Sequence, residues 1–378
     1  MASVPSTAST SGAAIEHLAA SAYRVPTETD HESDGTLVWD STDIVVVEAH
    51  ADGHVGLGYT YCHPAAASVV SEKLADVVKG ADALAPGEAW KRMQVEVRQM
   101  GHAGIAAMAV SAVDVALWDL ESRLLGLCLA DALPRCRHST PIYGSGGFCN
   151  YSDETLRHQL TGWVQAGCSS VKMKIGRDKA RDLGRVAVAR DAVGDEIELM
   201  VDANGAYAPK EAVGWAERFA GELGVSYLEE PVTSQDLAGL RFVREHGPGG
   251  LSVAAGEYGW NLTDSERMLD AGAVDILQAD VSRCGGITGM LGVDALCRAR
   301  SMPFSAHCCP AITGHVGCAM ESLIHAEYFF DHARVEGMLF EGALGPEGGA
   351  LTPDRTRPGL GLELRRDDAR RYRVGGSA

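Results

Sequence analysis

The sequence lacks the patterns that would place this chain in a membrane or on a nucleic acid. No apolar run is long enough to span a bilayer, and the N-terminus has no basic segment of the kind that opens a secretory signal. No Lys/Arg cluster offsets the excess of 51 acidic over 33 basic residues, and the resulting net charge of −18 repels polyanions. We therefore expect a cytoplasmic protein with no membrane or nucleic-acid partner.

Paired cysteines are also absent. The ten cysteines include no C-x-x-C pair, and the adjacent Cys308 and Cys309 do not easily bridge with normal disulfide geometry. This spacing predicts buried free thiols in a reducing compartment. No G-x-S-x-G segment occurs, which argues against a Ser-His-Asp hydrolase.

The first third of the chain has the signals of an α+β domain. Residues 1–13 are rich in Ser, Thr and Ala and are predicted to be disordered. An Asp-Gly turn between Asp43–His50 and Val55–Thr60 predicts a hairpin, and the apolar spacing over 104–125 predicts a helix. We predict an N-terminal α+β capping domain over residues 1–140.

From residue 141 onward, short apolar strands alternate with helical segments at a near-constant period. This pattern predicts an α/β fold, a (β/α)7β TIM-like barrel over residues 141–345, followed by a segment, 346–378, that packs back on the capping domain. The predicted strands lie near Ile142–Tyr143 and at Ser170–Ile175, Glu198–Ala203, Ser226–Glu230, Leu251–Glu257, Asp275–Asp280, Pro303–His307 and Ala326–Phe329.

A charged residue stands at the end of nearly every predicted strand. The C-terminal ends of barrel strands meet at one mouth, where barrel enzymes place their active sites, so we expect these side chains to converge there. A single buried carboxylate could be only a salt-bridge partner, but so many charges in phase favour a site. They are Lys172, Lys174, Asp202, Glu229, Glu257, Asp280, His307 and Glu327, spaced at about one β/α unit.

Lys172 and Lys174 are two residues apart in one strand, so their side chains point to the same side. Two ammonium groups near a metal favour each other's neutral form, and the lowered pKa suits a general base. The alternative is a pair of surface lysines, which the apolar run Val171–Ile175 disfavours.

Asp202, Glu229 and Glu257 end three successive strands and would repel one another without a cation. An all-oxygen ligand set suits Mg²⁺ rather than Zn²⁺, so these residues predict one Mg²⁺ site. Glu230 is the rival of Glu229, and strand alternation predicts that only one of the two faces the metal. The alternative is a carboxylate set paired entirely with lysines.

Asp280 and His307 end neighbouring strands, and a carboxylate beside an imidazole fixes its tautomer and raises its basicity. We expect His315 and His325 to be structural. Glu327 faces the same mouth, where it could stay protonated and donate a hydrogen bond to a negatively charged intermediate.

Together these motifs resemble the enolase superfamily, in particular its mandelate racemase-like subgroup. The resemblance covers nearly the whole chain, because residues 106–119 also look like a helix of that family's capping domain. The motifs are Val171–Ile175, Val201–Asn204, Leu228–Pro231, Ala255–Glu257, Asp280 with Gly285-Gly286, Ser305–His307 and His325–Phe329.

The resemblance implies a role for each residue. Lys174 would be one base and the Asp280–His307 dyad the base on the opposite face. Lys172 and Glu327 would bind the substrate carboxylate as its charge grows, and Asn204 would bond a substrate hydroxyl. The implied chemistry is abstraction of the proton next to a carboxylate, giving an enediolate that Mg²⁺ stabilises.

The family resemblance leaves the outcome of that step open. We favour loss of water, as in an acid-sugar dehydratase; the alternatives are a racemase or epimerase, and a non-catalytic metal-binding barrel. The expected partner is a small-molecule carboxylate, and a sugar acid is favoured. We also expect copies of this chain to form a homo-oligomer. The loops Thr27–Gly35 and Tyr59–His63 are expected to contact the substrate, without a recognisable pattern.

Overall fold

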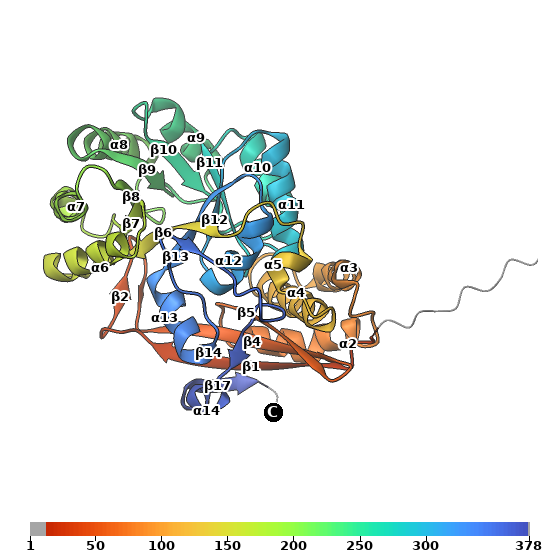
Figure 1. The fold of residues 1–378 in the computed structure, drawn as a ribbon. Helices are drawn as coiled ribbons and strands as arrows, with labels where there is room; N and C mark the ends of the chain where they lie inside the picture. Colours follow the sequence, from red (N-terminus) through yellow and green to blue (C-terminus); the bar gives the residue numbers. More distant parts are fainter. Residues whose placement is uncertain (1–12, 377–378) are drawn as a thin grey trace, which may run out of the picture.

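The computed structural model describes residues 13–376 of the chain. Most of the segment predicted to be disordered, residues 1–13, lies outside this range. Of the described helices, none combines the length and the hydrophobicity that crossing a bilayer requires. Figure 1 shows a barrel with an antiparallel sheet beside it, on which the C-terminal end of the chain also lies.

The capping sheet has the strand order β17-β1-β4-β5. Its strands are β1 (His17–Pro26), β4 (Ser41–Ala51), β5 (His54–Thr60) and β17 (Arg373–Gly376). The predicted hairpin is confirmed, because β4 and β5 pair up to Ala51 and His54 around a two-residue turn. Asp52 and Gly53 have φ of 47° and 73°, which matches the preference of Asp-Gly for such turns.

The predicted helix is confirmed as α4 (Ile105–Leu124), which packs on β5. Gly56 and Gly58 allow this close approach, since a Cβ atom on either would lie 2.2 Å from a backbone oxygen of α4. The other elements of this part are β2 (Glu32–Ser33), β3 (Val38–Trp39), α1 (Ala65–Val69), a π-helical turn (Val70–Leu74), α2 (Ala75–Val78), α3 (Pro86–Glu96), a 3₁₀ turn (Val97–Gln99) and α5 (Leu129–Ala132).

Eight parallel strands form the barrel, and the pairing of β13 with β6 closes it. The predicted fold class, a (β/α)7β barrel with an α+β capping domain, is confirmed. The strands are β6 (Thr140–Gly146), β7 (Ser170–Lys174), β8 (Glu198–Asp202), β9 (Val225–Glu229), β10 (Ser252–Ala255), β11 (Ile276–Asp280), β12 (Phe304–His307) and β13 (Leu323–Phe329).

Helices surround the barrel, as Figure 1 shows for α6 to α11. Their amphipathic faces pack on the strands; in α8, for example, the buried residues Ala212, Ala216 and Phe219 recur at helical spacing. The helices are α6 (Asp153–Gln165), α7 (Lys179–Val193), α8 (Pro209–Leu223), α9 (Leu237–His246), α10 (Leu262–Asp270), α11 (Gly286–Ala299), α12 (Pro310–Val316), a 3₁₀ turn (Gly317–Ala319) and α13 (Phe330–Leu339).

After α13 the chain returns from the barrel to the capping sheet. β15 (Ala350–Leu351) pairs with β6, β14 (Phe340–Glu341) pairs with β16 (Glu363–Leu364), and β17 pairs antiparallel with β1. The short helix α14 (Arg366–Ala369) and a 3₁₀ turn (Arg370–Tyr372) precede β17. The domain boundaries at residues 140 and 345 stay a prediction.

Asp119, on α4, joins three parts of this arrangement. Its fully buried carboxylate accepts hydrogen bonds from the amides of Leu57 on β5 and Leu360 in the C-terminal segment, at 2.7 and 2.5 Å. It also pairs with Arg123 at 2.7 Å. One side chain therefore connects the capping sheet, its helix and the end of the chain.

We expect Asp119→Ala to lower the free energy of unfolding by about 3 kcal/mol, because it leaves two buried amides and a guanidinium without their acceptor. Urea unfolding followed by circular dichroism measures this. Asp191, whose ion pair with Arg157 is largely exposed, supplies the control: Asp191→Ala should cost less than about 1 kcal/mol. Equal losses in the two variants would contradict the role given to Asp119.

Candidate active site

The predicted site residues lie together at the C-terminal ends of the barrel strands. All eight charged residues named above have at most 5% of their surface exposed. Lys174, Asp202, Glu229, Asp280 and His307 are the last residues of their strands, and Glu257 follows β10 by two residues. Parallel strands in register bring their ends to one level, as the pairing of Asp280 with His307 and of Asp202 with Glu229 shows.

Lys172 stands at the centre of a ring of oxygen atoms. Its Nζ lies 2.6 Å from Glu229 Oε2 and 2.8 Å from Glu327 Oε1, and it donates to the hydroxyl of Tyr143 at 3.2 Å. Lys174 Nζ donates to Asp202 Oδ2 at 2.5 Å. Each lysine thus has a carboxylate partner from another strand.

The carboxylates oppose the lowering of pKa that was expected for the two lysines beside a metal. Burial lowers the pKa of Lys172, but the charges of Glu229 and Glu327 raise it by more, so it lies well above its usual value. Burial lowers the pKa of Lys174 and so does the charge of Lys172, but Asp202 and the other carboxylates raise it above its usual value. The expected low pKa depended on a nearby metal, so it stays a prediction.

The carboxylates themselves are not fully compensated by the protein. Burial and the charge of Asp202 raise the pKa of Glu229 to about 8, despite the pairing with Lys172. Among the buried side-chain oxygens of the described residues that have no hydrogen-bond partner are one each of Glu229, Glu230 and Asn204. Glu229, Glu257 and His307 each offer a ligand atom within 4.8 Å of the others. Unpaired buried carboxylate oxygens of this kind fit a hard divalent cation such as Mg²⁺.

The backbone at Glu230 leaves the strand geometry on which its comparison with Glu229 was based. The strand β9 ends at Glu229, and Glu230 has a left-handed φ of 38°. Strand alternation therefore does not decide where its side chain points, and the choice between the two residues stays a prediction. Burial raises the pKa of Glu230, and the charges of Glu257, Asp202 and Glu229 raise it further.

His307 is held by acidic groups at both ring nitrogens. Nδ1 lies 2.8 Å from Asp280 Oδ2, while Nε2 lies 2.6 Å from Glu257 Oε2 and 3.4 Å from Glu327 Oε2. Asp280 is oriented in turn by the amide of Ser282, which donates to Oδ1 at 2.7 Å. The dyad predicted from the neighbouring strands is therefore in hydrogen-bonding contact.

Glu327 does not have the protonated carboxyl group that its position suggested. Burial raises its pKa, but Lys172, His307 and Lys174 together lower it well below the usual range. Besides Lys172, it accepts hydrogen bonds from Ser145 Oγ at 2.6 Å and from Cys308 Sγ at 3.2 Å. The Glu327 carboxyl group thus lies between Lys172 Nζ, at 2.8 Å, and His307 Nε2, at 3.4 Å.

Sequence reasoning missed four side chains of this cluster. Tyr143 and Ser145 lie two residues apart on β6, and strand alternation would have found them if that strand had been predicted at its full length. Arg283 lies 3.4 Å from Asp280 and 3.6 Å from Glu257, and its guanidinium stacks on Tyr258. Cys308 follows His307, and no pattern in the sequence marks it.

A cavity of about 380 Å³ opens over the cluster. Of the predicted residues, Lys174, Asn204, Glu257, His307 and Glu327 line it, and the others lie behind them. The predicted substrate loops contribute Asp34, Tyr61, Cys62 and His63. Residues between these loops were missed, and they are Trp39, Ser41, Thr42 and Asp43.

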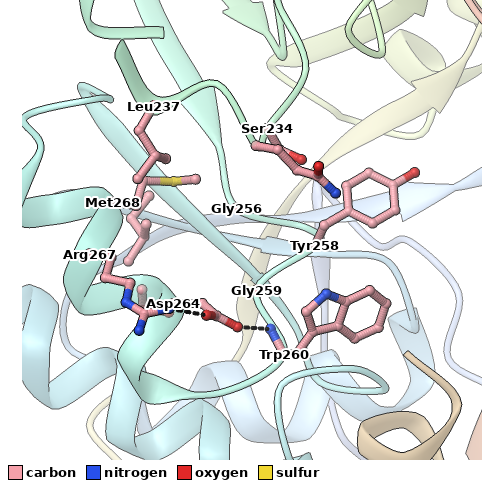
Figure 2. A pocket seen from close by; sticks show the side chains of 12 residues that line it. Ser234, Leu237, Gly256, Tyr258, Gly259, Trp260, Asp264, Arg267 and Met268 are labelled. Carbon is pink, nitrogen blue, oxygen red and sulfur yellow. Dashed lines mark hydrogen bonds and ion pairs between the residues drawn. The ribbon is translucent and has the colours of Figure 1, made fainter. Parts of the chain in front are cut away.

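A second cavity, of about 370 Å³, lies between the loops that follow β9 and β10 (Figure 2). Tyr258 lines both cavities, but no predicted site residue lines this one. Its acidic residue, Asp264, accepts from the amide of Trp260 and pairs with Arg267. The charged residues of this cavity pair with one another at the start of α10. The predicted bases line the first cavity instead, which is therefore the candidate active site.

Both parts of the chain match known protein families. Residues 155–369 match a family described as enolase C-terminal domain-like, and residues 24–133 match the mandelate racemase/muconate lactonizing enzyme N-terminal domain. The 3,6-anhydro-alpha-L-galactonate cycloisomerase of Streptomyces coelicolor is 32% identical over 360 residues, which cover 93% of this chain and 98% of that protein.

Two solved structures extend the comparison. A mandelate racemase/muconate lactonizing enzyme-like protein from Rubrobacter xylanophilus is 58% identical, with a TM-score of 0.93 over 96% of this chain and 100% of its own. The L-talarate/galactarate dehydratase of Salmonella typhimurium LT2, liganded with Mg and L-lyxarohydroxamate, is 25% identical, with a TM-score of 0.88 over 100% of this chain and 97% of its own. The relatives thus include both isomerases and dehydratases.

Proposed function

Because the chain belongs to the mandelate racemase/muconate lactonizing enzyme family of the enolase superfamily, we propose that it is a Mg²⁺-dependent acid-sugar dehydratase. The observation that carries this proposal is the pair of bases in one cavity. Lys174 comes from β7 and His307 from β12, and these strands are separated by β6 and β13 on one side of the barrel and by β8–β11 on the other. A substrate between them has a base on each side.

In the proposed reaction, one base removes the proton from the carbon next to the carboxylate. The electron pair of that C–H bond forms the C=C bond of an enediolate, which carries two negative charges. Fully buried Lys172, which pairs with Glu229 and Glu327 and does not itself line the cavity, would stabilise this charge through the positive charge of its ammonium group. Mg²⁺, held by Asp202, Glu229 and Glu257, would add electrostatic stabilisation of this charge.

The second half of the reaction breaks the bond between the β-carbon and its oxygen. The electrons of the enediolate return to form the α,β double bond, and the β-oxygen leaves with the electrons of its own bond. Protonated His307, oriented by Asp280, donates a proton to that oxygen, so water leaves and the enol product becomes a 2-keto-3-deoxy acid. If the β-oxygen belonged to a ring of the substrate, its elimination would open the ring and would use the same residues.

Lys174 can act as a base only in its neutral form, whereas Asp202 stabilises the protonated form. The contact of 2.5 Å between them stabilises the ammonium form. A cation held by Asp202 would compensate its charge and weaken that stabilisation, so the base strength of Lys174 would depend on metal binding.

The alternative product is the other stereoisomer of the substrate. A racemase or epimerase would return a proton to the same carbon from the second base, and the position of bases on two sides of one cavity permits this second function as well. Incubation of a library of acid sugars in D₂O tests both. Keto-acid formation supports the dehydratase, inversion with deuterium at the α-carbon supports the racemase, and no reaction or exchange with any acid contradicts both.

We expect EDTA to abolish turnover and Mg²⁺ to restore it, because the carboxylate oxygens of the site have no sufficient partner in the protein. Glu257→Gln should weaken Mg²⁺ binding more than about tenfold, as measured by calorimetry. Glu198→Gln, which alters a carboxylate at the opposite end of β8, is the matched control and should leave binding unchanged. Full turnover of metal-free protein would contradict the three-carboxylate site. A homo-oligomer and a cytoplasmic location stay predictions.

A further inference from the structure

The two ends of the active-site cavity differ in chemistry. The inner end holds the bases and the carboxylate cluster described above. The outer end is built by the segment before β4, by β4, by the segment that follows β5, and by the start of α13. Its polar residues are Asp34, Ser41, Thr42, Asp43, His63 and Asp331.

Acidic groups outnumber basic ones along the cavity wall. The described residues that line it include the carboxylates of Asp34, Asp43, Glu257, Glu327 and Asp331 but, of Lys and Arg, only Lys174 and Arg283. Both cations are at the inner end and already engaged, Lys174 with Asp202 and Arg283 with Asp280 and Glu257.

Two of the outer carboxylates pair with arginines that do not line the cavity. Asp43 forms a two-pronged pair with Arg24, at 2.7 and 2.8 Å, from the neighbouring strand β1. Asp331 lies 3.4 Å from Arg334, one turn along α13. Neither arginine lines the cavity, so a ligand at the outer end meets the acidic partner of each pair first.

This arrangement distinguishes two kinds of sugar acid. A substrate hydroxyl group can donate a hydrogen bond to the carboxylate of Asp43 or Asp34. It can also donate a hydrogen bond to the hydroxyl of Thr42, whose Oγ donates to Asp331 at 3.0 Å. A carboxylate at the same place cannot donate, and it would be desolvated beside like charges with no free cation among the described lining residues.

We propose that the substrate is a monocarboxylate sugar acid with a neutral hydroxyl-bearing far end, and that the charge of the outer wall excludes dicarboxylates. This inference rests on the proposed function, since it assumes that the substrate carboxylate binds at the inner end. It adds which class of acid sugar enters the cavity and which residues make the choice.

Matched pairs of acids test the inference. Galactonate and galactarate, and likewise gluconate and glucarate, differ only in whether carbon 6 is a hydroxymethyl group or a carboxylate. With Mg²⁺ at pH 8 in D₂O, proton NMR follows α-deuterium exchange and product formation. We expect at least one monoacid to react about tenfold or more faster than its diacid partner, which corresponds to an unfavourable charge contact of ~1.4 kcal/mol or more.

The outcomes separate this inference from the proposed function. Faster reaction of the diacids, or equal rates within each pair, would overturn the inference and leave the proposed function standing. Failure of every acid sugar to exchange or react would overturn both.

A variant then tests the cause of the preference. In Asp43→Asn, Arg24 loses its partner and adds a cation near the outer wall, so the rate ratio of diacid to monoacid should rise about fivefold or more. Glu48→Gln is the matched control: it lies on the same strand and also loses an arginine pair, with Arg366, but it does not line the cavity. Because both acids are assayed on one preparation, the ratio does not depend on the folded fraction. An unchanged ratio in Asp43→Asn would overturn the assignment to the outer carboxylates.

Discussion

Replacing His307 with asparagine is expected to lower kcat by a factor of about 10²–10⁴, because it removes the base that Asp280 orients in the cavity. Lys174→Ala should lower kcat by a similar factor, since it removes the base on β7. In D₂O, exchange at the α-carbon should survive in one variant and be lost in the other, and the variant that loses it identifies the base facing the substrate proton.

His315 supplies the control for His307. It is equally buried, but it lies beside Cys128 and away from the cavity, and burial lowers its pKa to about 4. His315→Asn should therefore keep its turnover per folded molecule. Unchanged exchange in both His307→Asn and Lys174→Ala would remove both residues from the proposed mechanism.

Glu327→Gln is expected to reduce both stability and turnover. Its carboxylate pairs with fully buried Lys172 at 2.8 Å, and loss of one partner from a buried pair costs about 3–5 kcal/mol. Glu229 remains as a second partner of Lys172, so we expect a value near the lower end of this range. Turnover should fall as well, because the variant changes the charge next to His307.

Thermal unfolding and turnover measured on the same preparation check this expectation. Glu211→Gln is the matched control, since it also removes a carboxylate from a lysine pair, with Lys179, but both partners are partly exposed. Its loss of stability should be less than about 1 kcal/mol. A melting temperature of Glu327→Gln equal to that of the control would contradict the buried pairing, and unchanged turnover would remove Glu327 from the mechanism.

The convergence of the site residues could be predicted from the sequence because it follows from strand geometry. Alternation places Lys172 and Lys174 on one side of β7, and parallel register brings Asp202 beside Lys174 and His307 beside Asp280. These relations need only strand positions, which short apolar runs between helical segments reveal. The fold class was predictable for the same reason.

The protonation states could not be predicted in this way. Glu327 was expected to stay protonated because it is held away from solvent; burial does raise its pKa, but Lys172 and His307 from other strands lower it by more. Strand alternation could not decide where Glu230 points, because its φ of 38° ends the alternation of β9. The outer wall was only partly predicted, since Trp39, Thr42 and Asp43 reach the cavity by domain packing, which leaves no periodic pattern in the sequence.

The pairing of β17 with β1 has a consequence for the synthesis of the chain. β17 (Arg373–Gly376) is made long after β1 (His17–Pro26), so translation at about 5–20 residues per second separates the two strands by tens of seconds. During that time β1 can pair with β4 on one side, but its other edge has no β17 to pair with. Such an edge can pair with other chains, so the nascent protein is exposed to aggregation until β17 has emerged from the ribosome.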